Sequence, residues 1–181
     1  ESPVQYRAYI DRLAEVSGIA IHTFADIVEA LRVRHRFFAE HGCRLSDHGI
    51  EEFYADDYTD DEVNKLFQRV YAGECLTPAE TRRFKSAMLY EFGLMDAETG
   101  WTQQFHYGAI RNNNSTMMAA LGPDTGFDSI GEFNTAKAMS RYFDRLAIRG
   151  SLAKTIIYPL NPCANEMVAP MLGNFQDGTV P

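Results

Sequence analysis

The segment WTQQFHYGAIRNNN, residues 101–114, decides the fold class of this 181-residue chain. Polar and aromatic residues alternate over its first ten positions, as they do in a β-strand, and the asparagines that follow favour a turn. A loop rich in Gly and Asp comes next. The later elements are predicted in the order helix, strand and helix, at residues 133–148, 154–160 and about 164–173. Strands that alternate with helices are typical of parallel βα units.

Helix signals dominate the sequence before this segment. Residues that cap helix N-termini, capping-box patterns and glycines that end helices predict four helices. They run from Ser2 to Gly18, from Thr23 to Gly42, over residues 60–72 and over residues 78–96. Between the second and third of these helices, CRLSD at 43–47 predicts a short buried strand that ends in polar groups.

Two architectures fit this order of elements: a doubly wound parallel sheet and a (β/α)₈ barrel. The sequence contains neither the glycine fingerprint of a dinucleotide site nor a P-loop. The predicted strands are too few to close a barrel, and complete barrels take about 250 residues. We therefore expect residues 1–181 to be one α/β domain, or part of one, and the chain to be a segment of a longer enzyme.

The charge and the apolar content of the sequence limit the kinds of partner that the protein can bind. The net charge of −8 and the pI near 5.1 argue against binding to the phosphate backbone of nucleic acids. No apolar run is long enough for a membrane span, and the first residues lack the pattern of a signal peptide. Three cysteines stand far apart, as expected for reduced thiols. We expect a soluble, cytoplasmic protein without disulfides, nucleic acid or membrane partners.

Polar residues gather where the predicted strands end, and in parallel α/β folds these ends carry the chemistry. An Asp beside a His offers a general base with an orienting group, whereas Arg and Asn donors suit carboxylates and hydroxyls. The clusters are Ser46, Asp47 and His48; His106 with Arg111 and Asn112 to Asn114; and Asn161, Asn165 and Glu166. Together they predict a small, oxygen-rich substrate.

Each cluster also has a purely structural interpretation. Asp47 and His48 are also typical of a helix cap, and His106 of a core histidine. The asparagine triplet is typical of a turn. Asp124 and Asp128 are typical of a turn or of a cation site, and either could instead pair with Arg111 and hold the following loop in place. The histidines show no spacing typical of zinc ligands, so we predict no metal site within this sequence. His35 is expected on the surface.

Four strings in this order resemble the uronate isomerase (glucuronate isomerase) family, an atypical branch of the amidohydrolase superfamily. They are HGCRLSDHG at 41–49, FHYGAIRNNN at 105–114, LGPDTGFDSIG at 121–131 and NP..NE..A.MLGNFQDG at 161–178. The resemblance covers nearly the whole chain and implies the central βα units of a (β/α)₈ TIM-type barrel, incomplete in this chain and helix-rich. These units would be roughly the fourth to sixth barrel strands.

The resemblance also implies an activity. Members of this family interconvert D-glucuronate with D-fructuronate and D-galacturonate with D-tagaturonate in hexuronate catabolism, by moving a proton between C2 and C1. It implies catalytic roles for His106, Asp47 and His48. It further implies that a hexuronate is bound by Arg111, Asn113 and Asn161.

Family members are longer and hold a divalent metal, usually zinc, with a histidine pair on the first barrel strand and an aspartate on the last. These elements have no counterpart here, so we expect the metal in the full-length enzyme and none in this segment, which should be inactive alone. We also expect a homo-oligomer. The alternatives are a metal-dependent hydrolase of the same superfamily and a non-catalytic folding or assembly segment.

Overall fold

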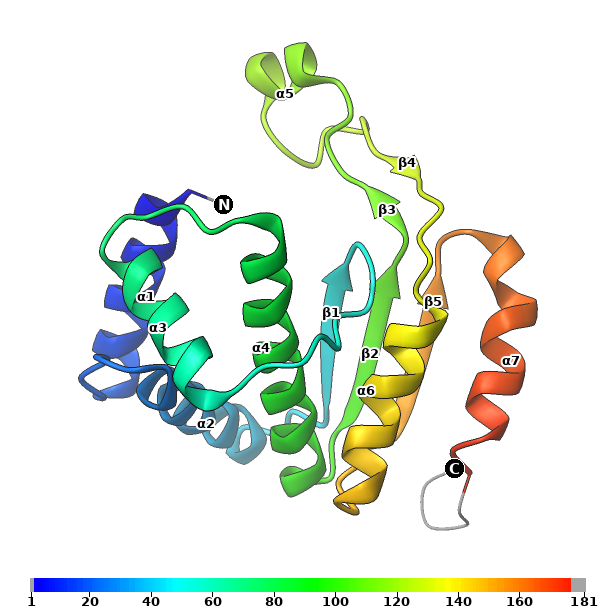
Figure 1. Cartoon of the computed structure of the whole chain (residues 1–181), viewed down its shortest axis with the longest axis horizontal. Coiled ribbons are helices and arrows are strands. Elements are labelled where there is room, and N and C mark those ends of the chain that lie inside the picture. The colour runs from blue at the N-terminus through cyan, green and yellow to red at the C-terminus, as the bar shows by residue number, and fades with distance from the viewer. Residues whose placement is uncertain (1, 177–181) are drawn as a thin grey trace.

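The computed structural model describes residues 2–176, and the predicted helices and strands occur in the predicted order, with an unpredicted helix at 115–121 and an unpredicted short strand at 129–130 among them (Figure 1). The elements are α1 (Pro3–Ser17), α2 (Phe24–Glu40), β1 (Leu45–Ile50), α3 (Asp60–Tyr71), α4 (Pro78–Thr99), β2 (Thr102–Tyr107), β3 (Ala109–Ile110), α5 (Ser115–Leu121), β4 (Ser129–Ile130), α6 (Ala136–Ile148), β5 (Thr155–Pro159), the 3₁₀-helix η1 (Pro162–Ala164) and α7 (Asn165–Gly173). The last two positions of the 161–178 string lie outside the described residues.

The main sheet has three parallel strands in the order β1-β2-β5. β2 is central, and its pairing sets Asp47 opposite Gln104, Gly49 opposite His106, and His106 opposite Tyr158. Parallel neighbours need long crossover connections, and α3, α4 and α6 lie in these connections. The predicted α/β class with parallel strands is confirmed.

The first four helices each begin after a residue whose side chain can accept a hydrogen bond from an otherwise unpaired backbone N–H group of the first helical turn. Ser2, Thr23, Thr59 and Thr77 each accept a hydrogen bond from the backbone three residues on, and each forms a complete capping box. The predicted starts of these four helices are therefore confirmed, and α4 ends slightly later than predicted, at Gly100 with φ 70°.

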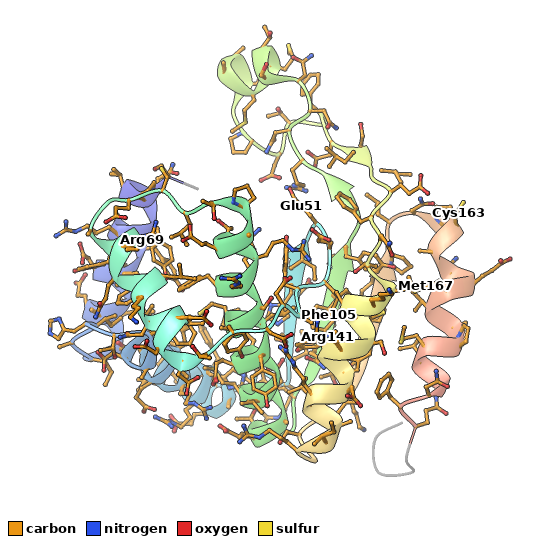
Figure 2. The ribbon with its side chains drawn as sticks, in the orientation of Figure 1. Glu51, Arg69, Phe105, Arg141, Cys163 and Met167 are labelled. Carbon is orange, nitrogen blue, oxygen red and sulfur yellow. The ribbon has the colours of Figure 1, made fainter. Side chains whose placement is uncertain are left out.

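An aromatic core joins the sheet to the helices that cover it. Phe53, Phe105, Tyr142 and Phe143 are buried together in one cluster, and Phe105 lies where β2 meets α6 (Figure 2). The buried amide of Gln103 is satisfied from both sides: its nitrogen donates to Thr155 Oγ1 at 2.7 Å and its oxygen accepts from Tyr142 Oη at 2.8 Å. These two hydrogen bonds tie β2 to β5 and to α6 and leave neither end of the Gln103 amide unpaired.

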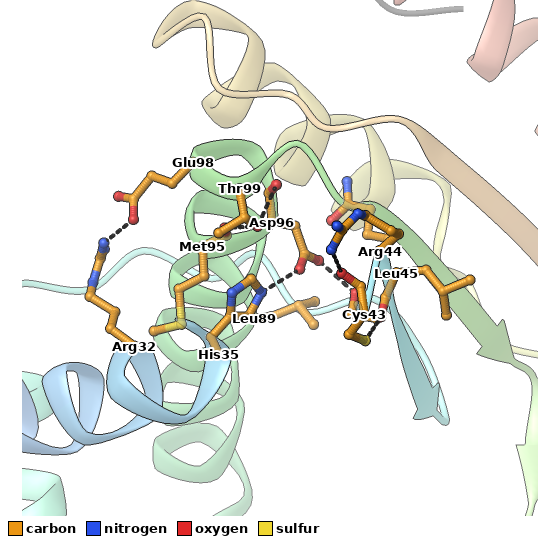
Figure 3. Close-up of polar contacts among 12 residues, drawn as sticks. Arg32, His35, Cys43, Arg44, Leu45, Leu89, Met95, Asp96, Glu98 and Thr99 are labelled. Carbon is orange, nitrogen blue, oxygen red and sulfur yellow. Dashed lines mark hydrogen bonds and ion pairs between the residues drawn. The ribbon is translucent and has the colours of Figure 1, made fainter. Parts of the chain in front are cut away.

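A second cluster packs α1, α2 and α3 together, and a buried carboxylate links these helices to the sheet. Asp96 is 1% exposed; it contacts His35 Nε2 at 3.0 Å (Figure 3) and accepts from Ser46 Oγ at 2.6 Å. The His35 ring stacks on Trp101 with centroids 3.8 Å apart. The expected surface position of His35 is wrong, because this ring fills the junction between α2, α4 and the sheet.

Two predicted strands differ from the structure. The strand predicted at 43–47 is β1, which begins at Leu45 and ends at Ile50, and it is not buried: its residues alternate between exposed and half-buried. The strand predicted at 101–110 breaks at Gly108, whose φ of 98° turns the chain out of the sheet. The chain then forms the antiparallel pair β3–β4, and α5 lies at its tip (Figure 1).

No helix among residues 2–176 is both long enough and apolar enough to cross a membrane.

Because α4 packs closely against α6, we expect the stability of the fold to be sensitive to a side chain at Gly93. A Cβ there would lie 2.6 Å from Tyr142 Oη and 2.7 Å from Leu146 Cδ1, and both side chains are buried. We expect Gly93→Ala to lower the free energy of unfolding by about 1 kcal/mol or more, because overpacking outweighs the gain in helix propensity. Thermal unfolding measures the change.

Gly173→Ala is the matched control, since a Cβ at this helical glycine meets nothing within 4 Å. It should leave the melting temperature unchanged or raise it slightly. Equal melting temperatures for the two variants would contradict the packing argument.

Candidate active site

The site lies on the face of the sheet opposite the aromatic core. Side chains alternate along a strand, so Gln103, Phe105 and Tyr107 of β2 point to the helices while Gln104 and His106 point to the other face. That face is open in the described part of the chain: Ile156 and Tyr158 of β5 are 42% and 41% exposed.

His106 and Asp47 meet across two strands on this face. His106 Nδ1 lies 2.7 Å from Asp47 Oδ1, and both side chains are 52% exposed. An ionised carboxylate only accepts hydrogen bonds, so Nδ1 carries the proton and Nε2 of the neutral ring is left as the basic nitrogen. This pair is the usual arrangement of an oriented general base.

Tyr158 and Gln104, which were not singled out in the sequence, complete the group. The Tyr158 ring stacks on His106 with centroids 4.4 Å apart and planes 4° apart. Its hydroxyl donates to Gln104 Oε1 at 3.0 Å. The signal that could have found Tyr158 is its place near the end of the 154–160 strand, because parallel strands bring such positions together at one sheet edge.

A pocket of about 580 Å³ opens beside these residues. This volume suits a small polar metabolite. The residues that line this pocket include Gly49, Glu51, His106, Arg111, Asp128 and Tyr158. Glu51 directly follows β1, and Cys163 lies in η1 just before α7, at the same end of the molecule (Figure 2).

Arg111 lines the pocket, but its guanidinium is already paired. It contacts Asp124, and its Nη1 lies 2.7 Å from Asp128 Oδ2. The backbone N–H of Asn112 donates to Asp128 Oδ1 at 2.8 Å. The structural interpretation of Asp124 and Asp128, which places them in a turn, therefore has direct support: both aspartates hold the loop between β3 and β4 against Arg111.

The structure does not bring His48 to this site. His48 follows Asp47 by one residue and so points to the opposite face, where its ring stacks between Phe92 and Phe105 at 5.4 and 5.3 Å. Its Nε2 is buried without a hydrogen-bond partner among the described residues. The expectation that Asp47 and His48 act side by side is wrong because strand alternation separates them; neither residue caps a helix, since both lie within β1.

Asn113 and Asn161 are held in backbone turns and do not line the pocket of His106. Asn113 Nδ2 donates to the Ile110 carbonyl at 3.1 Å. Asn161 Oδ1 accepts from the Cys163 N–H at 3.0 Å and so caps η1. Asn161 instead borders a smaller pocket of about 220 Å³ beside Tyr107.

A catalytic zinc needs about three protein ligands. Over residues 2–176 no group of three or more His, Cys, Asp or Glu side chains is placed to hold a metal ion. His106 and Asp47 form only a pair, so the described residues do not by themselves fit a catalytic metal.

Parallel strands with helical crossovers, and polar groups on the strand ends beside a pocket, define an α/β protein of the barrel-enzyme type. The sequence profile described as "Glucuronate isomerase" matches residues 2–181. The chain belongs to the glucuronate isomerase family.

Curated relatives are similar over the whole chain. Uronate isomerase from Phocaeicola vulgatus is 66% identical over 181 residues, which are 100% of this chain and 39% of that protein. The Bacteroides fragilis uronate isomerase is 62% identical over 181 residues, with the same shares covered. The chain thus spans about 39% of the length of these relatives.

Solved structures agree in fold. The crystal structure of uronate isomerase from Thermotoga maritima superposes with a TM-score of 0.88 at 29% identity, over 94% of this chain and 37% of that one. Glucuronate isomerase from Caulobacter crescentus gives 0.81 at 29% identity, over 90% of this chain and 34% of that one. The helix-rich, parallel α/β chain is therefore a partial barrel of the expected type.

The buried position of His48 predicts a pH dependence of stability. Loss of hydration lowers the pKa of His48, against the opposing attraction of Asp96 and Asp47. An unfolded histidine has a pKa of about 6.5, so below that pH the unfolded chain binds more protons than the folded one. Stability should therefore fall as the pH drops below this value and be unaffected well above it.

His48→Phe removes this titration and retains a ring between Phe92 and Phe105. We expect the variant to lose less stability than the parent between pH 8 and pH 5.5, measured by urea unfolding at both values. An unchanged acid dependence would contradict the assignment of a neutral, buried His48.

Proposed function

We propose that the protein containing this chain is an aldose–ketose isomerase that interconverts D-glucuronate with D-fructuronate and D-galacturonate with D-tagaturonate. The observation that carries the proposal is the His106–Asp47 pair at 2.7 Å, which faces a pocket of about 580 Å³. Membership of the glucuronate isomerase family supports the substrate class.

The reaction needs a group that moves a proton between C2 and C1. His106 Nε2 takes the proton from C2, the C–H electron pair forms the C1–C2 double bond, and the C1 carbonyl pair moves to O1 to give an enediolate. The hydroxyl proton of O2 then passes to O1, the carbonyl forms at C2, and the C1–C2 pair takes the proton back from the imidazolium at C1. Asp47 holds Nδ1 and stabilises the imidazolium that exists between these steps, and such acid–base contributions are typically 10²- to 10⁴-fold.

Arg111 is the proposed site for the carboxylate of the uronate. Its planar guanidinium matches a carboxylate with two parallel hydrogen bonds. Asp124, whose side chain is 69% exposed, is the partner that a substrate carboxylate can replace, while Asp128 keeps the loop in place. Asn113 and Asn161 would reach the substrate only after their turns rearrange, so their proposed role is secondary.

The family resemblance implies a divalent metal, zinc, in the whole enzyme. Its ligands would have to come from outside residues 2–176, and no step above uses it. We also propose a cytoplasmic homo-oligomer, and the free thiols of Cys43, Cys75 and Cys163 suit a reducing compartment.

His106→Asn in the full-length enzyme tests the proposed base. We expect kcat for D-glucuronate to fall by about 10²-fold or more, with little change in melting temperature, because the side chain is half exposed. His22→Asn, at an exposed histidine on the loop before α2, is the control and should keep full activity. A nearly normal kcat for His106→Asn would reject the role, and cleavage of esters or amides by the parent would favour the hydrolase alternative.

Arg111→Lys separates carboxylate recognition from loop anchoring. If Arg111 binds the carboxylate, the variant should lose roughly 1.5–3 kcal/mol of uronate binding, the scale of charged hydrogen bonds, and bind a neutral sugar analogue almost normally. Calorimetric titration with both ligands measures the difference. Equal losses for both ligands, or a large drop in melting temperature, would assign Arg111 to the loop alone.

A further inference from the structure

The plane of the His106 ring is set by a neighbour on β5. Tyr158 lies directly opposite His106 in the parallel register, and the two rings are stacked with centroids 4.4 Å apart and planes only 4° apart. The hydrogen bond to Asp47 fixes one edge of the imidazole but leaves the ring free to tilt about that bond. The flat contact with Tyr158 removes this freedom.

Tyr158 is itself held in place. Tyr158 is 41% exposed, so burial restrains its ring only in part. Its hydroxyl donates to Gln104 Oε1 at 3.0 Å, and Gln104 is on the same strand and the same face as His106, two residues before it. The phenol is therefore fixed at both ends, by β5 at its Cα and by β2 at its hydroxyl.

Among residues 2–176, the opposite side of His106 is open. Gly49 occupies the facing position on β1, and a Cβ built there meets nothing within 4 Å. Gly49, His106 and Tyr158 all line the pocket. The imidazole of His106 thus has the Tyr158 ring on one side and the pocket on the other. Among the described residues, the stacking contact is what opposes a tilt of the imidazole toward the pocket.

We propose that Tyr158, anchored by Gln104, is a positioning residue that keeps His106 Nε2 aimed into the pocket. The inference rests on the proposed function of His106 and adds no chemical step: Tyr158 neither gives nor takes a proton in the reaction. Its contribution is geometric, because proton transfer requires close and aligned atoms, and a small displacement of a reacting group is costly in rate.

Kinetics of three variants of the full-length enzyme test this role. Tyr158→Leu removes the flat ring and should lower kcat roughly 10- to 100-fold with KM and melting temperature nearly unchanged. Tyr158→Phe retains the ring and should recover most of that loss. Ile156→Ala, at an exposed position on the same face of β5, controls for disturbance of the strand and should keep kcat.

Gln104→Leu removes the anchor without touching the ring. Its kcat should resemble that of Tyr158→Phe. The variant that combines both substitutions should have a kcat no lower than either single variant, because both remove the same hydrogen bond. A Tyr158→Phe variant as impaired as Tyr158→Leu, with a nearly normal Gln104→Leu, would overturn the proposal, since it would assign chemistry to the hydroxyl rather than to the anchor.

NMR of the His106 ring gives a readout that does not depend on turnover. Side-chain relaxation of the labelled imidazole should show a lower order parameter in Tyr158→Leu than in the parent, and no change in Ile156→Ala. If Tyr158→Leu had a normal order parameter for the His106 ring and a normal kcat while His106→Asn was inactive, the positioning role of Tyr158 would be rejected and the proposed function would stand. An active His106→Asn would instead reject the role of His106, and the relaxation data would still decide whether Tyr158 orders the ring.

Discussion

Strand alternation in β2 is the constraint on which the rest of the structure depends. Because β2 pairs on both sides with parallel neighbours, its register cannot slip by one residue without exchanging the two faces. One face supplies Gln103 and Phe105 to the core under α6. The other supplies Gln104 and His106 to the pocket.

The two faces are stabilised by different interactions. On the helical face, aromatic burial and the satisfied amide of Gln103 fix β2 against β5 and α6. On the open face, hydrogen bonds and one ring stack orient polar groups that stay half exposed. A rigid core thereby supports a site whose own contacts are few, which is the arrangement that a small-molecule enzyme needs.

The site is assembled from three strands and the loop beyond β2. Asp47 comes from β1, His106 from β2, and Tyr158 from β5, while Arg111 reaches the pocket from β3–β4 with Asp128. In the proposed site each strand supplies a different property: a carboxylate that sets the tautomer, the basic nitrogen, and a ring that sets the plane. Such division among strand ends is the general feature of parallel barrels.

The sequence by itself determined α1 to α4, α6 and α7, the parallel βα class and the positions of His106 and Asp47 on strands, because capping boxes, glycine stops and strand alternation are local signals. Only the tertiary structure decided that His48 faces the core and that Tyr158 stacks on His106. These contacts depend on register between strands and on which face the helices cover. Both are set by packing between segments about 50 residues apart, which no local pattern encodes.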